Sequence, residues 1–129
     1  MSAGGDVDML QTQAGNDAAV DAGGAIAIGT MKAGHGIDLA AQQMTFDDLE
    51  APDSITLLSR AGNVTGASLT TRDAFVAASG DIGLDAAYIG DRINLAATDI
   101  AADVTQTSTG QPLYSVLTGY QGGVAKRIT

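Results

Sequence analysis

Residues 80–84 read Gly-Asp-Ile-Gly-Leu, a glycine and a polar residue followed by apolar residues at alternate positions. Related segments occur at Gly5-Asp6-Val7-Asp8-Met9, at Gly24-Ala25-Ile26-Ala27-Ile28 and at Gly62-Asn63-Val64. Alternation of this kind is typical of a β-strand with one buried face. Gly, Asp, Asn and Ser interrupt the apolar runs, so we expect strands of about three to five residues, too short to hold a free-standing sheet.

Aligning these segments gives a repeat of roughly 18–20 residues. Two apolar columns contain Val20, Leu39, Leu57, Val76 and Leu95, and Ala18, Ile37, Ile55, Ala74 and Ile93. Two more lie half a period away, with Val7, Ile26, Met44, Val64, Ile82 and Ile100, and Met9, Ile28, Phe46, Gly66, Leu84 and Ala102. A looser set indicates a third face: Met31, Leu49, Leu69 and Ile89.

The repeat predicts an all-β fold, a parallel β-helix (β-solenoid) of about six coils with roughly 18–20 residues per coil, in which each strand pairs with its equivalent one coil away. Residues 1–106 form the solenoid in this interpretation, and residues 107–129 are a C-terminal tail or the start of a following region. We expect glycine, Asn and Asp at the corners to provide positive φ or tight turns. The alternative is a β-sandwich with strands every 8–12 residues or so, which the sustained register disfavours.

The composition narrows the function classes. The chain has 129 residues, 17 Gly, no Cys and a net charge of −9, and every acidic residue except Glu50 is Asp. A disulfide or zinc-thiolate scaffold needs Cys, and nucleic-acid binding needs a basic face. We expect no signal peptide at the start, and no membrane insertion because no apolar run approaches about 18 residues. The only histidine, His35, lies between Gly34 and Gly36 and is interpreted as a turn residue, so we predict no His-based catalytic or multi-His metal site and no enzyme.

Two columns are predicted to face solvent. One contains Asp17, Gly36, Ser54, Asp73 and Arg92, and in it Asp73 and Arg92 are neighbours able to form an ion pair. The next contains Asp38, Thr56, Phe75 and Asn94. Phe75 is therefore a candidate partner contact, for a protein or a glycan. The alternative is a side chain that lies over a corner or under a neighbouring segment.

Aspartates also recur at the repeat distance. Asn63, Asp81 and Asp99 follow one another at this distance, and so do Asp85 and Asp103. Stacked carboxylates repel one another unless they are solvated, hydrogen-bonded to turn amides or bridged by a cation. The four aspartates are thus candidate Ca²⁺ ligands, with corner residues that cap turn amides as the alternative and acid–base carboxylates as a third interpretation. The sequence predicts no other cofactor.

The repeats resemble those of the filamentous haemagglutinin family of large secreted bacterial exoproteins. The closest stretches are Ala61-Gly62-Asn63-Val64, residues 79–86 and residues 91–97. The resemblance implies a right-handed parallel β-helix, a location outside the cell or at the bacterial surface, and secretion through an outer-membrane transporter. It covers roughly residues 1–105 and carries over no catalytic residue. The family's N-terminal secretion domain is not seen in this sequence.

Three functions follow as hypotheses. The first is a non-catalytic adhesin shaft that presents binding regions, whose partners are the adjacent coils of a longer chain and a host-cell or glycan receptor. The second is a self-assembling filament subunit that stacks end to end, because a solenoid without capping repeats has unpaired strand edges. The third is a glycan-binding or glycan-processing β-helix, for which Phe75 and Tyr88 are the aromatic side chains available outside the tail and the core columns.

Overall fold

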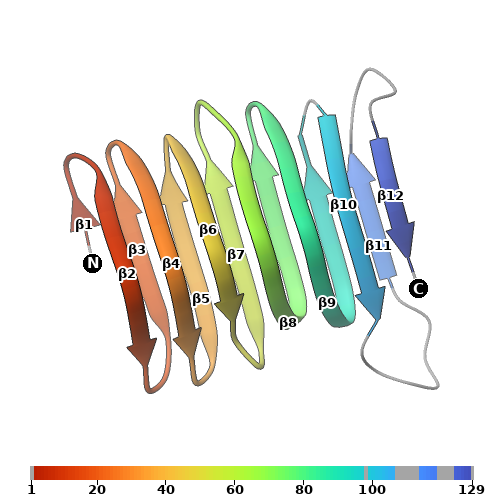
Figure 1. The fold of residues 1–129 in the computed structure, drawn as a ribbon, viewed down its shortest axis with the longest axis horizontal. Helices are drawn as coiled ribbons and strands as arrows, with labels where there is room; N and C mark the ends of the chain where they lie inside the picture. Colours follow the sequence, from red (N-terminus) through yellow and green to blue (C-terminus); the bar gives the residue numbers. More distant parts are fainter. Residues whose placement is uncertain (1, 98, 107–113, 119–123, 129) are drawn as a thin grey trace.

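The computed structural model of the chain describes residues 2–97, 99–106, 114–118 and 124–128, with side chains described for residues 4–90 and 92–97. Twelve strands make up the regular structure of these ranges (Figure 1). They are β1 (Ser2–Ala3), β2 (Val7–Ala14), β3 (Ala18–Ala22), β4 (Ala25–Ala33), β5 (Gly36–Ala41), β6 (Gln43–Glu50), β7 (Ser54–Ser59), β8 (Val64–Ala78), β9 (Asp81–Ala96), β10 (Asp99–Gln106), β11 (Tyr114–Thr118) and β12 (Val124–Ile128).

The strands form two walls of a stacked coil. One wall runs β1-β3-β5-β7 and continues through the second halves of β8 and β9 to β11. The other runs β2-β4-β6 and continues through the first halves of β8 and β9 to β10 and β12. Every pairing between these strands is parallel. Up to β10 the successive partners are about one repeat apart, as in Leu39 opposite Leu57 and Ile26 opposite Met44, whereas β11 and β12 pair at longer separations, as in Arg92 opposite Tyr114 and Ile100 opposite Val124. The predicted parallel β-helix is confirmed.

The four predicted core columns are also confirmed in register. Val20 lies opposite Leu39, Leu57 opposite Val76, and Val76 opposite Leu95. Their side chains, together with those of the column two residues earlier, are nearly all buried. Like stacks on like, so that the apolar interior is continuous along the rod and each coil buries the end of the one before it.

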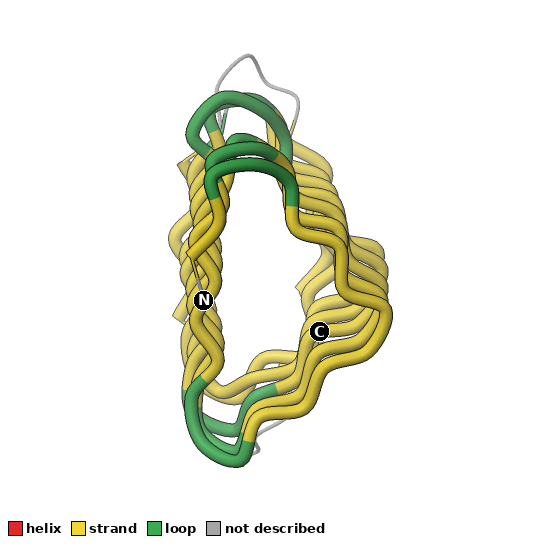
Figure 2. Tube along the Cα trace, turned by 90° about the vertical axis from the view of Figure 1, so that its left-hand side faces the viewer, coloured by secondary structure: helices red, strands yellow, loops and turns green. Residues whose placement is uncertain are grey.

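The second wall is bent, whereas the first is straight (Figure 2). Regular pairing skips one residue in each coil of the bent wall, at Leu10, Gly29, Asp47, Ala67 and Asp85. The strands continue through this bend, so that β4 has 9 residues. β8 has 15 because it also runs past the next corner into the straight wall. The prediction of strands of three to five residues was therefore wrong, because the bend turns the chain without ending the pairing.

The bend creates the third face, with one correction to its residues. Met31 lies opposite Leu49 and Leu49 opposite Leu69, as predicted, but Ala87 and not Ile89 lies opposite Leu69. Ile89 is fully buried in the next inward column, opposite Thr71. Ala87 and Ile89 are two residues apart and both point inward, and the prediction took the larger of the two as the partner of Leu69.

The inward and outward assignment gives a stability prediction. Leu57 is 1% exposed, whereas the neighbouring Thr56 points outward and is partly exposed. We expect Leu57→Asp to destabilise the fold by roughly 3–5 kcal/mol, because its charge would be buried without a partner, and to unfold the chain at ambient temperature. Val76→Asp is expected to do the same, and Thr56→Asp to change the melting temperature little. Equal losses in thermal melts of Leu57→Asp and Thr56→Asp would contradict the assignment.

Candidate functional site

A ladder of charged side chains crosses three coils at one corner of the solenoid. His35 lies in the turn between β4 and β5, Asp17 in the turn one coil before it, and Asp53 in the turn one coil after it. The His35 Nδ1 is 2.6 Å from Oδ1 of Asp17, and its Nε2 is 3.1 Å from Oδ2 of Asp53. One imidazole thus bridges carboxylates of the preceding and the following coil.

The ladder continues into a fourth coil through Arg72 on β8. Its Nη2 is 3.0 Å from Oδ1 of Asp53 and 3.5 Å from Oδ2 of Asp73. Asp17, His35, Asp53 and Arg72 follow one another at the repeat distance, so each coil contributes one residue and acidic and basic side chains alternate. We call these four residues the corner ladder.

The carboxylates change the proton affinity of the imidazole. The hydrogen bond to Asp17 and its negative charge raise the pKa of His35 above 6.5, and the charge of Asp53 adds to this effect. The side chains of His35 and Asp17 are 57% and 64% exposed, so solvent screens these interactions. His35 lies in a turn, as expected, but this interpretation missed its contacts. In register Asp17 is level with Gly36, because Ala18 pairs with Ile37, and its carboxylate reaches sideways to His35.

Side-chain oxygens at the corners also accept backbone hydrogen bonds from the next coil. The Ala25 amide donates to Oδ1 of Asp6 at 2.8 Å, and the Gly36 amide to Oδ1 of Asp17 at 3.1 Å. The Asp81 amide donates to Oδ1 of Asn63, also at 2.8 Å. The acceptor in each case lies one coil before the donor. We call these interactions amide caps; they satisfy N–H groups that lie just outside the regular ladder.

Glycine makes room for two of these caps. A Cβ atom on Gly24 would overlap the Asp6 carboxylate, and one on Gly80 would overlap the Asn63 carboxamide. None of the glycines from Gly4 to Gly83 has a φ in the left-handed region. Of the two expected roles of corner glycines, positive φ or tight turns, positive φ was therefore wrong for this part of the chain. At Gly23, Gly24, Gly34 and Gly80 a side chain is excluded because the preceding coil approaches closely.

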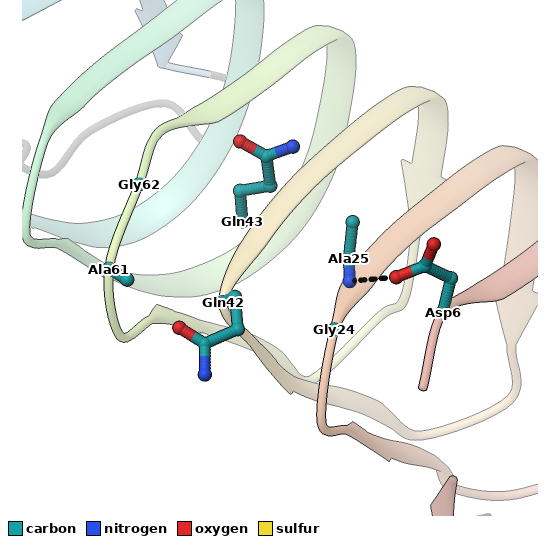
Figure 3. Close-up of a pocket in the computed structure, with 7 residues that line it drawn as sticks. All are labelled: Asp6, Gly24, Ala25, Gln42, Gln43, Ala61 and Gly62. Atoms are coloured by element: carbon teal, nitrogen blue, oxygen red, sulfur yellow. Dashed lines mark hydrogen bonds between the residues drawn. The ribbon is translucent and has the colours of Figure 1, made fainter. Parts of the chain in front are cut away.

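A hollow of about 300 Å³ lies at the corner that precedes β4 (Figure 3). Asp6 and Gly24 stand at one end of it, Gln42 and Gln43 in the middle, and Gly62 at the other. Ala25 occupies the same register position as Asp6 and Asn63 but has no oxygen to cap the next coil. The hollow is the space left where this short side chain interrupts the column of caps.

A second hollow, of about 330 Å³, lies beside the corner ladder. It is lined by Asp17, His35, Asp38, Ser54 and Thr56, with backbone and small side chains between them. In the residues whose side chains are described, no group of three or more His, Cys, Asp or Glu side chains is arranged to hold one metal ion. In the corner ladder the two aspartates, Asp17 and Asp53, belong to different coils, with His35 between them.

The structure places the predicted Ca²⁺ candidates only in part. Asp81 lies opposite Asp99 in register, as predicted. Asp85 is exposed at the bend, and the register shifts between Ala102 and Val104, beside Asp103. The side chains of Asp99 and Asp103 lie outside the described residues, so the Ca²⁺ site remains a prediction. The caps made by Asp6 and Asn63, in the column of Asp81, favour the alternative interpretation of a turn cap.

The outward columns have the predicted register, but the first is partly covered, since Gly36 is buried and the Asp73 side chain is only 19% exposed. Phe75 faces outward between Thr56 and Asn94 and is half-buried. Asp73 lies opposite Arg92, but the ion pair described for Asp73 is with Arg72, its neighbour in sequence. Arg72 therefore takes the role predicted for Arg92, because it can reach both Asp53 and Asp73.

The two candidate aromatic residues for a glycan site do not lie together. Phe75 belongs to the straight wall, whereas Tyr88, which is 41% exposed, belongs to the bent wall. Stacking of a sugar needs aromatic rings along one groove. The two side chains therefore do not form a single platform.

No protein-family model, curated protein or solved structure matches this chain. Within the described part of the chain, there is no helix of the length and apolar character needed to cross a membrane.

A double-mutant cycle tests the match between cap and glycine. We expect Gly24→Ala to destabilise the protein by roughly 1–3 kcal/mol, because the new methyl group displaces the Asp6 carboxylate and leaves the Ala25 amide without its acceptor. In the Asp6→Ala background the same Gly24→Ala change should have a much smaller effect. Chemical unfolding of the four proteins measures the coupling. Additive losses would mean that Gly24 is required for another reason.

The amide caps also give an expectation for calcium. If Asp81 is a cap like Asn63 in its column, it needs no cation. We therefore expect the same melting temperature and sedimentation coefficient in roughly 5 mM Ca²⁺, a saturating level for weak sites, and in chelator. A rise in melting temperature with Ca²⁺ that is lost in Asp81→Asn would show that the aspartate columns bind the ion.

Proposed function

We propose that this chain is a non-catalytic shaft segment of a secreted bacterial adhesin of the filamentous haemagglutinin kind, which holds binding regions away from the cell surface. The observation that carries the proposal is the parallel pairing of each described strand with the strand of the next coil along both walls, from β2 to β12 and from β1 to β11. A rod built in this way grows by roughly 4.8 Å with each coil. Its length is therefore set by the number of repeats.

The polar groups at the corners support a structural function. The corner ladder and the amide caps direct charged and polar side chains at neighbouring coils. Ser59 is buried and donates to the carbonyl of Gln42, and Arg60 reaches back to the carbonyl of Ala22 and the carboxylate of Asp21. These side chains hold one coil to another, and that is the property that a spacer needs.

End-to-end stacking is a second candidate function, favoured by one observation. Among the described strands, β2 pairs only with β4, so that its other edge presents unpaired backbone groups, and Leu10 at its bend is 88% exposed. Such an edge can template another strand. Sedimentation velocity over a wide concentration range distinguishes the candidates: a monomer throughout supports the spacer alone, and concentration-dependent growth supports assembly.

A coil duplication tests the proposed spacer. Ala74 lies opposite Ile93, so duplicating residues 74–92 adds one full repeat in register. The variant is expected to fold with the same melting cooperativity and to be longer by roughly 5 Å in small-angle X-ray scattering. Duplicating residues 74–82 instead adds about half a repeat and should prevent folding. Loss of folding in the full-coil variant would contradict a shaft of modular length.

A glycan screen tests the remaining alternative. The spacer proposal predicts no saturable binding of oligosaccharides to the chain. Binding that is lost in Phe75→Ala but kept in Asn94→Ala, a change at the neighbouring position of the same column, would overturn it in favour of a glycan-binding β-helix.

A further inference from the structure

The hydrogen-bond geometry of His35 restricts its protonation state. A neutral imidazole has one N–H donor and one acceptor nitrogen, whereas an imidazolium has two donors. The Nδ1 of His35 is hydrogen-bonded to Oδ1 of Asp17 at 2.6 Å, and its Nε2 lies 3.1 Å from Oδ2 of Asp53 in an ion-pair contact. Since a carboxylate oxygen only accepts, both contacts are favourable only when the ring carries two protons.

The groups around His35 reinforce this restriction. Asp17 faces it from the turn before β3, and Asp53 from the turn before β7. Arg72 lies beyond Asp53 and binds its other carboxylate oxygen, so Asp53 is shared between two cationic side chains. Asp38, on β5, lines the same hollow as His35 but makes no described contact with the ring. The described neighbours in direct contact with the ring are both acidic.

The backbone at this corner depends on the same residues. The His35 amide donates to the carbonyl of Asn16 at 2.8 Å, and the Asp53 amide donates to the carbonyl of His35 at 2.9 Å. The corner ladder therefore joins three turns that each contribute only a few backbone hydrogen bonds. Loss of one side-chain contact leaves these backbone hydrogen bonds as the remaining ties between the two turns, which weakens their connection.

We propose that His35 is a proton-operated latch: doubly protonated, it ties the turns at Asp17 and Asp53 together across three coils, and loss of one proton breaks one of the two contacts. The latch goes beyond the proposed spacer function and does not rest on it. Its effect is local to this corner, because the buried core columns hold the rest of the coil irrespective of pH.

The direction of the pH dependence follows from the raised pKa of His35 in the folded chain. The proton is bound more tightly in the folded than in the unfolded state, so the contribution of the latch to stability is fully present below pH 6.5 and is lost as the pH rises through the higher folded pKa. The latch is therefore closed in mildly acidic solution and open in alkaline solution.

His35 is the only histidine in the chain, so its titration can be followed by NMR without assignment of other rings. We expect a pKa above 6.5 in the wild type, a large decrease in Asp17→Asn and a smaller one in Asp53→Asn. Asn at position 17 keeps an oxygen for the Gly36 amide, so that only the charge is lost. Asp38→Asn is the matched control and should leave the titration unchanged. Equal shifts in all three variants, or a pKa of about 6.5 in the wild type, would overturn the latch.

Hydrogen exchange tests the mechanical part of the proposal. At about pH 6 the amides of His35 and Asp53 should exchange more slowly in the wild type than in His35→Gln, and at about pH 9 the two proteins should exchange these amides at the same rate. The Leu57 amide, in the middle of β7, should show a ratio near one at both values. A ratio near one for the corner amides at acidic pH would show that His35 is protonated without holding the turns together.

Discussion

Pairing between equivalent residues one coil apart is the constraint on which the rest of this structure depends. The backbone N–H and C=O groups of a solenoid strand are not satisfied by residues close to it in sequence. They are satisfied by the strands one repeat before and after it. This forces each side chain to stack on its equivalents. The apolar columns are the direct result, since a single polar side chain in the column of Leu39 and Leu57 would lie between two apolar neighbours.

Variation in coil length has to be absorbed where pairing is not required. The step from Ala41 to its partner Ser59 is shorter than the step from Met44 to its partner Val64, so extra residues enter at the corner between β7 and β8. That corner carries Arg60, whose guanidinium reaches back two coils to the carbonyl of Ala22. The insertion thus adds a contact between coils that are not adjacent, while both walls keep their register.

The fold was predictable from the sequence because one period governs every core column. The predictions that were wrong or incomplete concern positions whose structure the apolar period does not determine. Ile89 was assigned to the wrong column because it and Ala87, two residues earlier, both face inward, and the apolar pattern favours the larger side chain. The strands were predicted too short because a bend at positions such as Gly29 looks in sequence like an interruption. The corner ladder was missed because the register aligns Asp17 with Gly36, one residue beyond the histidine that its carboxylate reaches.

Stacking like on like favours apolar columns and disfavours charged ones, and a chain with 15 acidic residues and six basic ones has to resolve this conflict. Equivalent carboxylates would stand roughly 5 Å apart, close enough to repel strongly. In the register column of Asp6 and Asp81, the neutral residues Ala25, Gln43 and Asn63 separate these two aspartates, although Asp99 lies directly opposite Asp81 in the next coil. The corner ladder instead alternates acid with base. The basic side chain beside Asp17 is His35, which is charged only when it carries a second ring proton. The charge of Arg72 is permanent. Charge balance beside Asp17 therefore depends on the protonation of His35.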